Sequence, residues 1–214
     1  MRLDYSKIKN NSKRITQVKI SPRKIFSARF MVFIILFSAM GVVAENLSYA
    51  DEEEKRRVDI SLTIFPRIVA VDNDFRSKLD PEKNVQLVFL YVEGKERAIS
   101  LAETLELKSK NIGGMRVDAG SLSLKKLLDE NEKKYATAIF ISERLSEDNL
   151  KSVIDYARNN NRIVFSPFVG DVERGVTVGI SVTNRVKPYF NSSTLKDSGI
   201  DINALLMKMS KRYE

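Results

Sequence analysis

The sequence predicts a single α/β domain of three layers, in which helices cover both faces of a mainly parallel sheet that closes with an antiparallel hairpin and a terminal helix. Two observations indicate the layers. Continuous apolar runs typical of buried parallel strands alternate with segments whose apolar residues recur every three or four positions. A third observation indicates the hairpin, because the segment at 176–182 alternates strictly between apolar and polar residues.

Two pairs of a strand and a helix are expected in the first half of the domain. The run VQLVFLYV at 85–92 predicts a buried strand, and a helix is predicted after it from the apolar face Ala98, Leu101, Ala102 and Leu105. Shorter elements follow, a strand at 115–118 and a helix at 124–128. The segment 57–71 fits both an alternating strand and a helix, so its structure stays open.

The middle of the domain predicts a further strand, helix and strand. The run ATAIFIS at 136–142 is the clearest buried strand. Ser146 is the expected N-cap of the next helix, whose apolar stripe is Leu150, Val153, Ile154 and Ala157. The helix is expected to end at 159–161, before a strand at 162–166.

The last third predicts a hairpin and a helix. The strand at 176–182 should be antiparallel and exposed on one face, and a turn at Asn184-Arg185 should lead into VKPYF, where Pro188 indicates an edge strand. We interpret the final apolar stripe as core, with a partner-docking helix as the alternative; its residues are Ile202, Leu205, Leu206, Met209 and Tyr213.

The positive charge of the chain lies almost entirely in its first 30 residues. That segment contains nine basic residues and one acidic residue, whereas the remainder contains 27 of each. Because binding to a polyanion needs clustered positive charge on the folded domain, we expect no nucleic-acid partner.

The basic segment leads into an apolar run, FMVFIILFSAMGVVA at 30–44, and then into small residues that end at Ala50. This order is typical of a secretory signal peptide, so residues 1–50 are the expected signal, with cleavage between Ala50 and Asp51. The alternative is an uncleaved anchor that leaves the domain facing the periplasm, although the run is shorter than the roughly 20 residues that span a bilayer. Residues 51–214 are then one exported domain, because they suffice for a real core and contain no linker.

The chain contains no histidine and no cysteine. Disulfides, thiolate nucleophiles, histidine general bases and most zinc or copper sites are therefore excluded. We expect no enzymatic activity, no cofactor and no metal.

Polar residues follow the strands expected to be parallel, where ligands collect in α/β sheets. They could together bind a small solute, and the alternative is that strand ends are polar because loops lie at the surface. These candidates are Glu93, Asp118, Ser142, Glu143, Arg144 and Ser166.

A second group of candidates lies in FSPFVGDVERGVTVGI at 165–180, where Asp171, Glu173 and Arg174 stand between two glycines. Three interpretations are open: an acid/base pair, a loop that contacts a partner or ligand, and a solvated turn. We favour the turn, because two carboxylates at i and i+2 of a loop fix no spacing and glycines permit left-handed backbone angles.

The last third resembles the end of the YfiR-like family of exported bacterial α/β domains, which are similar to half of a periplasmic binding protein. The matching positions, a glycine before a strand, an Asn ending the next strand, a Gly-Ile step and a Leu pair, are Gly175, Asn191, Gly199-Ile200 and Leu205-Leu206. The resemblance spans 57–213 and is specific from about residue 165. This chain departs from the family in having no cysteine, in Phe65-Pro66 where Trp-Pro is usual, and in a single glycine before the strand.

The resemblance implies that 57–70 is a helix and that the protein is a periplasmic regulator of an inner-membrane signalling protein, such as a diguanylate cyclase or a sensor kinase. The alternative function is a small-solute-binding protein or an accessory subunit of a transport system. A homodimer would supply the second lobe that a solute-binding protein needs.

Overall fold

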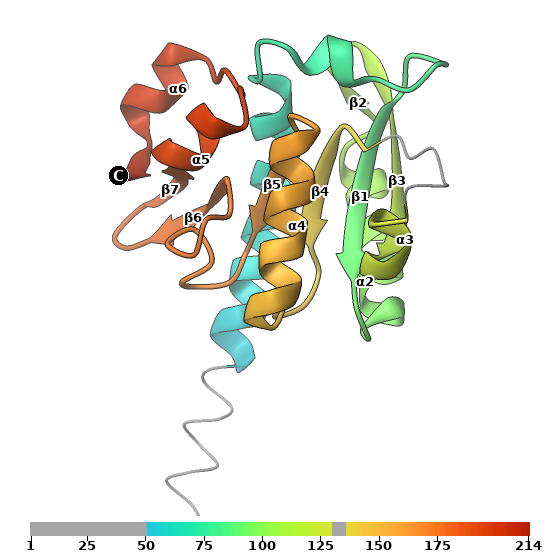
Figure 1. The fold of residues 1–214 in the computed structure, drawn as a ribbon, viewed down its shortest axis with the longest axis horizontal. Helices are drawn as coiled ribbons and strands as arrows, with labels where there is room; N and C mark the ends of the chain where they lie inside the picture. Colours follow the sequence, from blue (N-terminus) through green and yellow to red (C-terminus); the bar gives the residue numbers. More distant parts are fainter. Residues whose placement is uncertain (1–50, 130–135) are drawn as a thin grey trace, which may run out of the picture. The chain divides into compact units, whose positions relative to one another are not determined.

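The computed structural model describes residues 51–129 and 136–214, so the expected signal at 1–50 lies outside the described residues (Figure 1). Residues 50–214 form one compact unit. Its sheet has the strand order β2-β3-β1-β4-β5-β6-β7-β8. The strands are β1 Val85–Tyr91, β2 Asn111–Ile112, β3 Met115–Ser123, β4 Ala138–Ile141, β5 Ile163–Ser166, β6 Val178–Val182, β7 Val186–Asn191 and β8 Lys211–Tyr213.

Five adjacent strands, from β3 through β1, β4 and β5 to β6, are parallel to one another. β7 is antiparallel to β6, and β8 is parallel to β7. Residues 51–70 are helical, and the other helices are η1 Phe75–Lys78, α2 Lys95–Lys108, α3 Leu124–Leu127, α4 Glu147–Asn159, α5 Ser192–Asp197 and α6 Ala204–Met209. The predicted fold class, a mainly parallel α/β domain with a C-terminal antiparallel hairpin, is confirmed.

The two faces of the sheet have separate cores. On one face the 51–70 helix and α2 pack against the strands, and the ring of Phe65 lies 5.4 Å from Phe140 and 5.5 Å from Phe165, centroid to centroid. On the other face α3 and α4 pack against Leu90, Ile139 and Val164. The alternation of side chains along each central strand thus fills both layers, which is why these strands are continuous apolar runs.

The helix at 51–70 settles the segment whose structure the sequence left open. Its buried positions include Val58, Leu62, Phe65 and Val69, which are the helical alternative of the two patterns. Ser146 is the N-cap of α4, and its hydroxyl accepts a hydrogen bond from the backbone N–H of Asn149. The four residues of the predicted α4 stripe are all buried.

Two strands differ from their predictions. β3 continues to Ser123, five residues beyond the predicted end, because it pairs with β1 along the whole length of β1 although its second half is not apolar. β6 is buried over Val178, Gly179 and Ile180 and exposed only near its end, so the prediction of a half-exposed strand is wrong. It lies between two neighbouring strands, and a Cβ on Gly179 would meet the Ser166 carbonyl oxygen at 2.8 Å.

The prediction of a terminal helix reaching Tyr213 is also wrong. α6 ends at Met209, and the chain continues as β8, which pairs with the second half of β7. The predicted apolar stripe is divided: Ile202 is buried in the core and Leu206 packs against it, whereas Leu205 and Met209 are exposed and no residue of α6 is fully buried. Because β8 is the outer strand, β7 is not at the edge of the sheet, although the pairing begins at Tyr189 and leaves Pro188 bonded to β6 alone.

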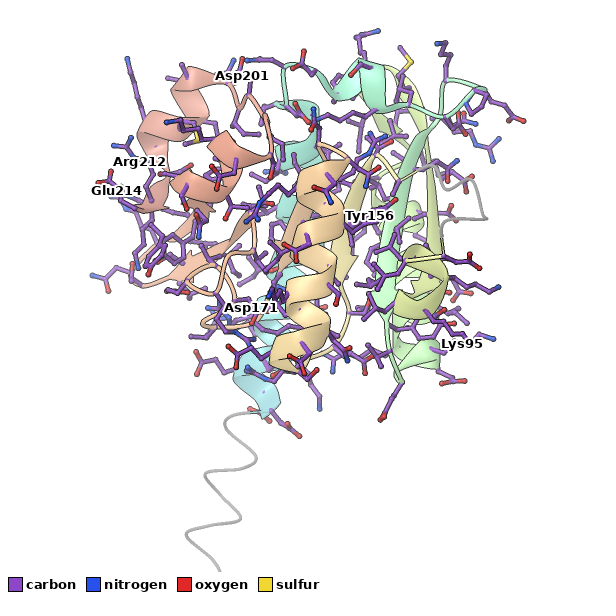
Figure 2. The ribbon with its side chains drawn as sticks, viewed as in Figure 1. Lys95, Tyr156, Asp171, Asp201, Arg212 and Glu214 are labelled. Carbon is purple, nitrogen blue, oxygen red and sulfur yellow. The ribbon has the colours of Figure 1, made fainter. Side chains whose placement is uncertain are left out.

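Lys95 of α2 and Arg212 of β8 lie on opposite sides of the domain (Figure 2).

No helix in the described part of the chain is long and apolar enough to cross a membrane.

Candidate functional site

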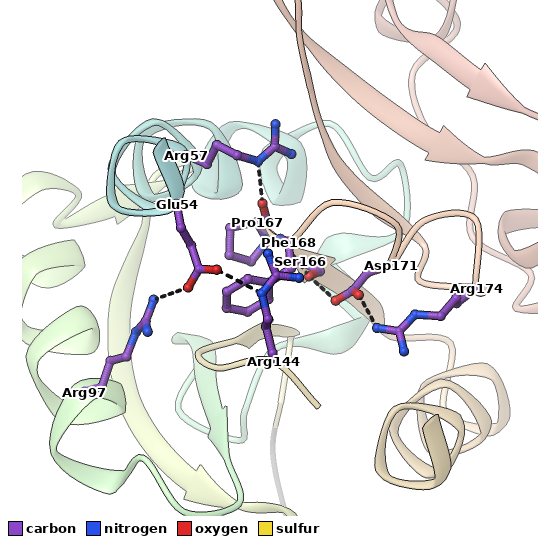
Figure 3. A network of polar contacts seen from close by, with 9 residues as sticks. All are labelled: Glu54, Arg57, Arg97, Arg144, Ser166, Pro167, Phe168, Asp171 and Arg174. Atoms are coloured by element: carbon purple, nitrogen blue, oxygen red, sulfur yellow. Dashed lines mark hydrogen bonds and ion pairs between the residues drawn. The ribbon is translucent and has the colours of Figure 1, made fainter. Parts of the chain in front are cut away.

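The loops after β1, β4 and β5 meet the first turns of the 51–70 helix at the carboxyl end of the parallel strands (Figure 3). Arg57 makes the deepest of these contacts, since only 9% of it is exposed. Its Nε donates to the carbonyl oxygen of Pro167 and its Nη2 to that of Ile180, both at 2.9 Å. Arg57 therefore ties the helix to the end of β5 and to β6.

The charge of Arg57 is poorly compensated. Burial lowers the pKa of the guanidinium, and the nearby carboxylate of Glu53 acts in the opposite direction. Arg57 forms no ion pair with any carboxylate among residues 51–129 and 136–214. A buried cation whose hydrogen bonds go to carbonyl oxygens, with Glu53 near it but not within ion-pair distance, is costly, and a ligand group that pairs with it directly would offset part of this cost.

Glu54, one helical position from Glu53, holds two further arginines. Its carboxylate lies 2.9 Å from Nε of Arg144 and 3.4 Å from Nη2 of Arg97. Both guanidinium groups also lie over the ring of Phe168, at 5.1 and 5.9 Å from its centroid (Figure 3). Arg144, a candidate from the sequence, is thus engaged in a surface ion pair and a cation–π contact.

Glu143 is occupied by the backbone of the loop after β1. Its carboxylate accepts hydrogen bonds from the N–H groups of Val92, Glu93 and Gly94, at 2.5 to 3.2 Å. Burial by itself raises the pKa of Glu143, but these hydrogen bonds outweigh it and the pKa is lowered. The backbone nest that could hold an anion at the start of α2 is filled by this side chain.

Asp171 closes the loop at 167–177, which returns from β5 to β6. The carboxylate is 1% exposed and lies 2.5 Å from both the Ser166 hydroxyl and Nη2 of Arg174. The Ser166 hydroxyl also accepts from the Phe168 N–H at 3.1 Å. The predicted solvated turn is therefore wrong for Asp171, whose role is to hold the loop, whereas Glu173 two positions later is exposed.

A pocket of about 270 Å³ lies between this loop, the hairpin and the start of the helix; we call it the Arg57 pocket. Charged and polar residues and apolar residues both line it. The residues that line it include Glu53, Arg57, Phe168, Val169, Val172, Glu173, Ile180, Val182, Tyr189 and Lys211.

Tyr189 and its neighbours form the outer wall of the Arg57 pocket. The ammonium of Lys211 lies 4.2 Å from the centroid of the Tyr189 ring. Burial raises the pKa of the Tyr189 hydroxyl, and the nearby Glu173 carboxylate raises it further. The charge of Glu173 also acts on Arg57, so this carboxylate lies near both the tyrosine and the buried guanidinium.

Of the nine candidates from the sequence, only Glu173 lines the Arg57 pocket. Ser142 is fully buried after β4, and its hydroxyl has no hydrogen-bond partner in the described part of the chain. Asp118 lies near the opposite end of the strands, beside the first residues of β1, and its carboxylate accepts a hydrogen bond from the Gln86 side chain at 2.8 Å. Its predicted place at a carboxyl end is wrong, because β3 continues to Ser123.

Sequence reasoning missed Glu53, Arg57, Tyr189 and Lys211. Arg57 was hidden because the structure of 57–71 was open, and Lys211 because it was expected on a helix. The described residues contain no group of three or more Asp or Glu that could hold a metal ion.

A comparison with models of protein families finds no match, and a comparison with curated protein sequences finds none either. Among solved structures, the chain is similar to a conserved domain protein from Vibrio cholerae O1 biovar El Tor, with TM-score 0.45, 15% identity and coverage of 67% of this chain and 60% of that one. It is similar to an ABC domain in complex with L-Trp from Streptococcus pneumoniae, with TM-score 0.43, 11% identity and coverage of 68% and 61%.

A third similar structure is the ligand-free, open form of a substrate-binding protein with adhesive properties from Clostridium difficile, with TM-score 0.42, 12% identity and coverage of 61% and 54%. The chain thus spans less than two thirds of the length of each of these proteins. At these identities the likeness concerns the arrangement of the backbone alone.

Proposed function

We propose that the domain is a non-enzymatic binding protein that holds a small polar solute in the Arg57 pocket. The observation behind this proposal is the buried guanidinium of Arg57, which lines the pocket and has no carboxylate partner in the described part of the chain. A solute that pairs with it would offset the desolvation of the charge, so binding would be favourable at this place.

The chemistry of the site supports binding over catalysis. Without histidine or cysteine, proton transfer and nucleophilic attack would fall to carboxylates, lysine, tyrosine or serine. The Ser166 hydroxyl is already hydrogen-bonded to Asp171, and the Glu143 carboxylate is bonded to three backbone N–H groups. Neither group is free to act on a substrate.

An exported location fits the same proposal. The signal peptide expected at 1–50 would bring the domain to the periplasm, in keeping with the YfiR-like resemblance, and there it would meet solutes that enter the cell envelope. A partner subunit or a second copy of the chain would supply the other wall of an enclosed site.

Thermal unfolding of the purified protein with a panel of metabolites tests the proposal. A solute at 100 times its Kd stabilises the folded state by about 2.7 kcal/mol, which raises Tm by roughly 5 to 10 °C for a domain of this size. The variant Lys211→Met should lose about half of the shift, as expected for roughly tenfold weaker binding, and Lys208→Met, which changes an exposed lysine outside the pocket, should keep it in full. A panel that includes sugars, carboxylates, amines and amino acids and gives no shift would contradict the proposal.

A second function, regulation of an inner-membrane signalling protein, is favoured by the rim of the pocket. Val169 is 62% exposed, Val182 39% and Val186 40%, and the last two are paired at the end of the hairpin. Exposed apolar side chains beside a polar pocket are typical of a docking surface.

Crosslinking in intact cells tests this second function. We expect capture of one integral membrane protein by the wild type, and loss of it in Val169→Lys. The control Leu107→Lys changes a side chain that is 81% exposed and lies at the end of α2, outside the pocket. If both variants capture the membrane protein equally well, the rim is not part of the interface.

A further inference from the structure

We infer that the solute of the Arg57 pocket is a small zwitterion with an apolar body, the chemistry of a free amino acid. This inference rests on the proposed function of the same pocket and adds to it the class of ligand. Three features of the lining lead to it: the balance of its charges, the position of each charge and the apolar floor.

The charges of the lining are balanced in number. Two cations, Arg57 and Lys211, face the pocket together with two carboxylates, Glu53 and Glu173. A solute with only negative charge would be attracted by the cations and repelled by the carboxylates, and a solute with only positive charge would meet the reverse. A solute with one charge of each sign gains from both pairs.

The positions of the charges give the solute an orientation. Two N–H groups of Arg57 are held by carbonyl oxygens, so the guanidinium is fixed in place while its other N–H groups are left to donate. A carboxylate is the group that matches them. The ammonium group would then lie toward the carboxylates, of which Glu53 is exposed at the start of the helix and Glu173 lies near the Tyr189 hydroxyl.

The floor of the pocket is apolar. Phe168, Val172 and Ile180 line it and are each at most 3% exposed. The volume of about 270 Å³ is below the roughly 300 to 1,000 Å³ of pockets that enclose drug-sized ligands. A short aliphatic or aromatic side chain would cover this floor, whereas a sugar would leave its hydroxyl groups against it without partners.

Calorimetric titration of the purified full-length protein tests the inference. The twenty standard amino acids are screened first, and the tightest is compared with its own deaminated and decarboxylated analogues. For leucine these analogues are 4-methylpentanoate and 3-methylbutylamine, which keep the side chain and remove one charge each. We expect at least one amino acid to bind, and each analogue to bind about tenfold or more weakly, since each loses one charged contact.

Two variants with matched controls locate the contacts. Glu53→Gln and Lys211→Met should each weaken binding of the amino acid about tenfold, because each removes one charge from the lining without disturbing the core. Glu52→Gln and Lys208→Met change exposed neighbours that do not line the pocket, and they should bind as the wild type does.

Three outcomes overturn the inference. The first is binding of the deaminated analogue as tightly as the amino acid, which would define a site for monoanions. The second is wild-type affinity in both lining variants. The third is no binding of any amino acid while a different solute raises Tm, a result that leaves the proposed function in place. If no solute shifts Tm, the proposed function and the inference both fail.

Discussion

The carboxylate of Glu143 shows how a single residue can join two strand ends. It follows β4, yet it accepts hydrogen bonds from three consecutive N–H groups after β1. These bonds lower its pKa in spite of its burial. The sequence presents the same residue only as one polar position among several, because nothing in it shows that three N–H groups converge there.

Acid should therefore weaken the domain through Glu143. Since the pKa is lower in the folded state than in the unfolded state, the stabilisation is present above the unfolded pKa and is lost as the pH falls through the folded pKa. Glu143→Gln should cost about 1 to 2 kcal/mol at neutral pH and less in acid, where the wild type loses the same contribution. Denaturant unfolding at a series of pH values measures this, with the exposed Glu103→Gln as the control. A pH-independent difference would contradict the prediction.

Asp171 and Glu173 should behave differently although they are two positions apart. Asp171→Ala removes a buried carboxylate from Ser166 and Arg174, so we expect a loss of about 2 to 3 kcal/mol in the free energy of unfolding. Glu173→Ala removes an exposed side chain and should change stability by less than about 0.5 kcal/mol, while it weakens solute binding. Equal destabilisation by the two changes would mean that the loop depends on both.

Part of the site could be predicted and part could not. Glu143, Arg144, Ser166 and Asp171 lie near the carboxyl ends of β4 and β5, as expected from the sequence, but of the sequence candidates only Glu173 lines the Arg57 pocket. The sequence contained no pattern that indicated pocket residues on elements outside the parallel strands. Arg57 reaches the pocket from a helix far earlier in the chain, and Lys211 reaches it from a strand that follows a helix of six residues.

At the scale of elements, α6 tests how the end of the chain is attached. Leu205 is 68% exposed, whereas Leu206 is half-buried and packs against the core that contains Phe190. Leu206→Ala should cost about 1 to 2 kcal/mol, and Leu205→Ala less than about 0.5 kcal/mol. Chemical denaturation of the two variants gives the comparison. Equal costs would indicate that Leu205 is also covered, by a partner or by a second copy of the chain.

Sequence periodicity predicts some helices and strands better than others, for a physical reason. Strands that pack on both faces, such as β1 and β4, are recognisable because nearly all of their residues are apolar. The final stripe is ambiguous because the same residues can face a core or solvent, and the pairing of β8 with β7 depends on a contact with residues 22 positions earlier. Long-range pairing of short segments is the information that periodicity does not contain.

At the scale of the whole molecule, the 51–70 helix belongs both to the hydrophobic core and to the lining of the Arg57 pocket. Its middle packs Phe65 among the rings of Phe89, Phe140 and Phe165, and its first turns carry Glu53 and Arg57 to the pocket. A solute bound at Arg57 would therefore strengthen the contact between this helix and the sheet. Binding would be reported as stability of the entire domain.

Export and cleavage should change the charge of the whole protein. The first 50 residues contain nine basic and two acidic residues, so cleavage after Ala50 leaves 27 basic and 26 acidic residues and lowers the net charge from +8 to +1. We expect the periplasmic fraction to contain a form that begins at Asp51 and focuses at a pH well below the full-chain pI of about 9.5. Intact-mass measurement and isoelectric focusing check this, and Ala50→Gln, which replaces the small residue at the cleavage site, should retain the basic precursor. A wild-type protein that stays in the membrane fraction at the pI of the full chain would contradict cleavage and favour the anchored alternative.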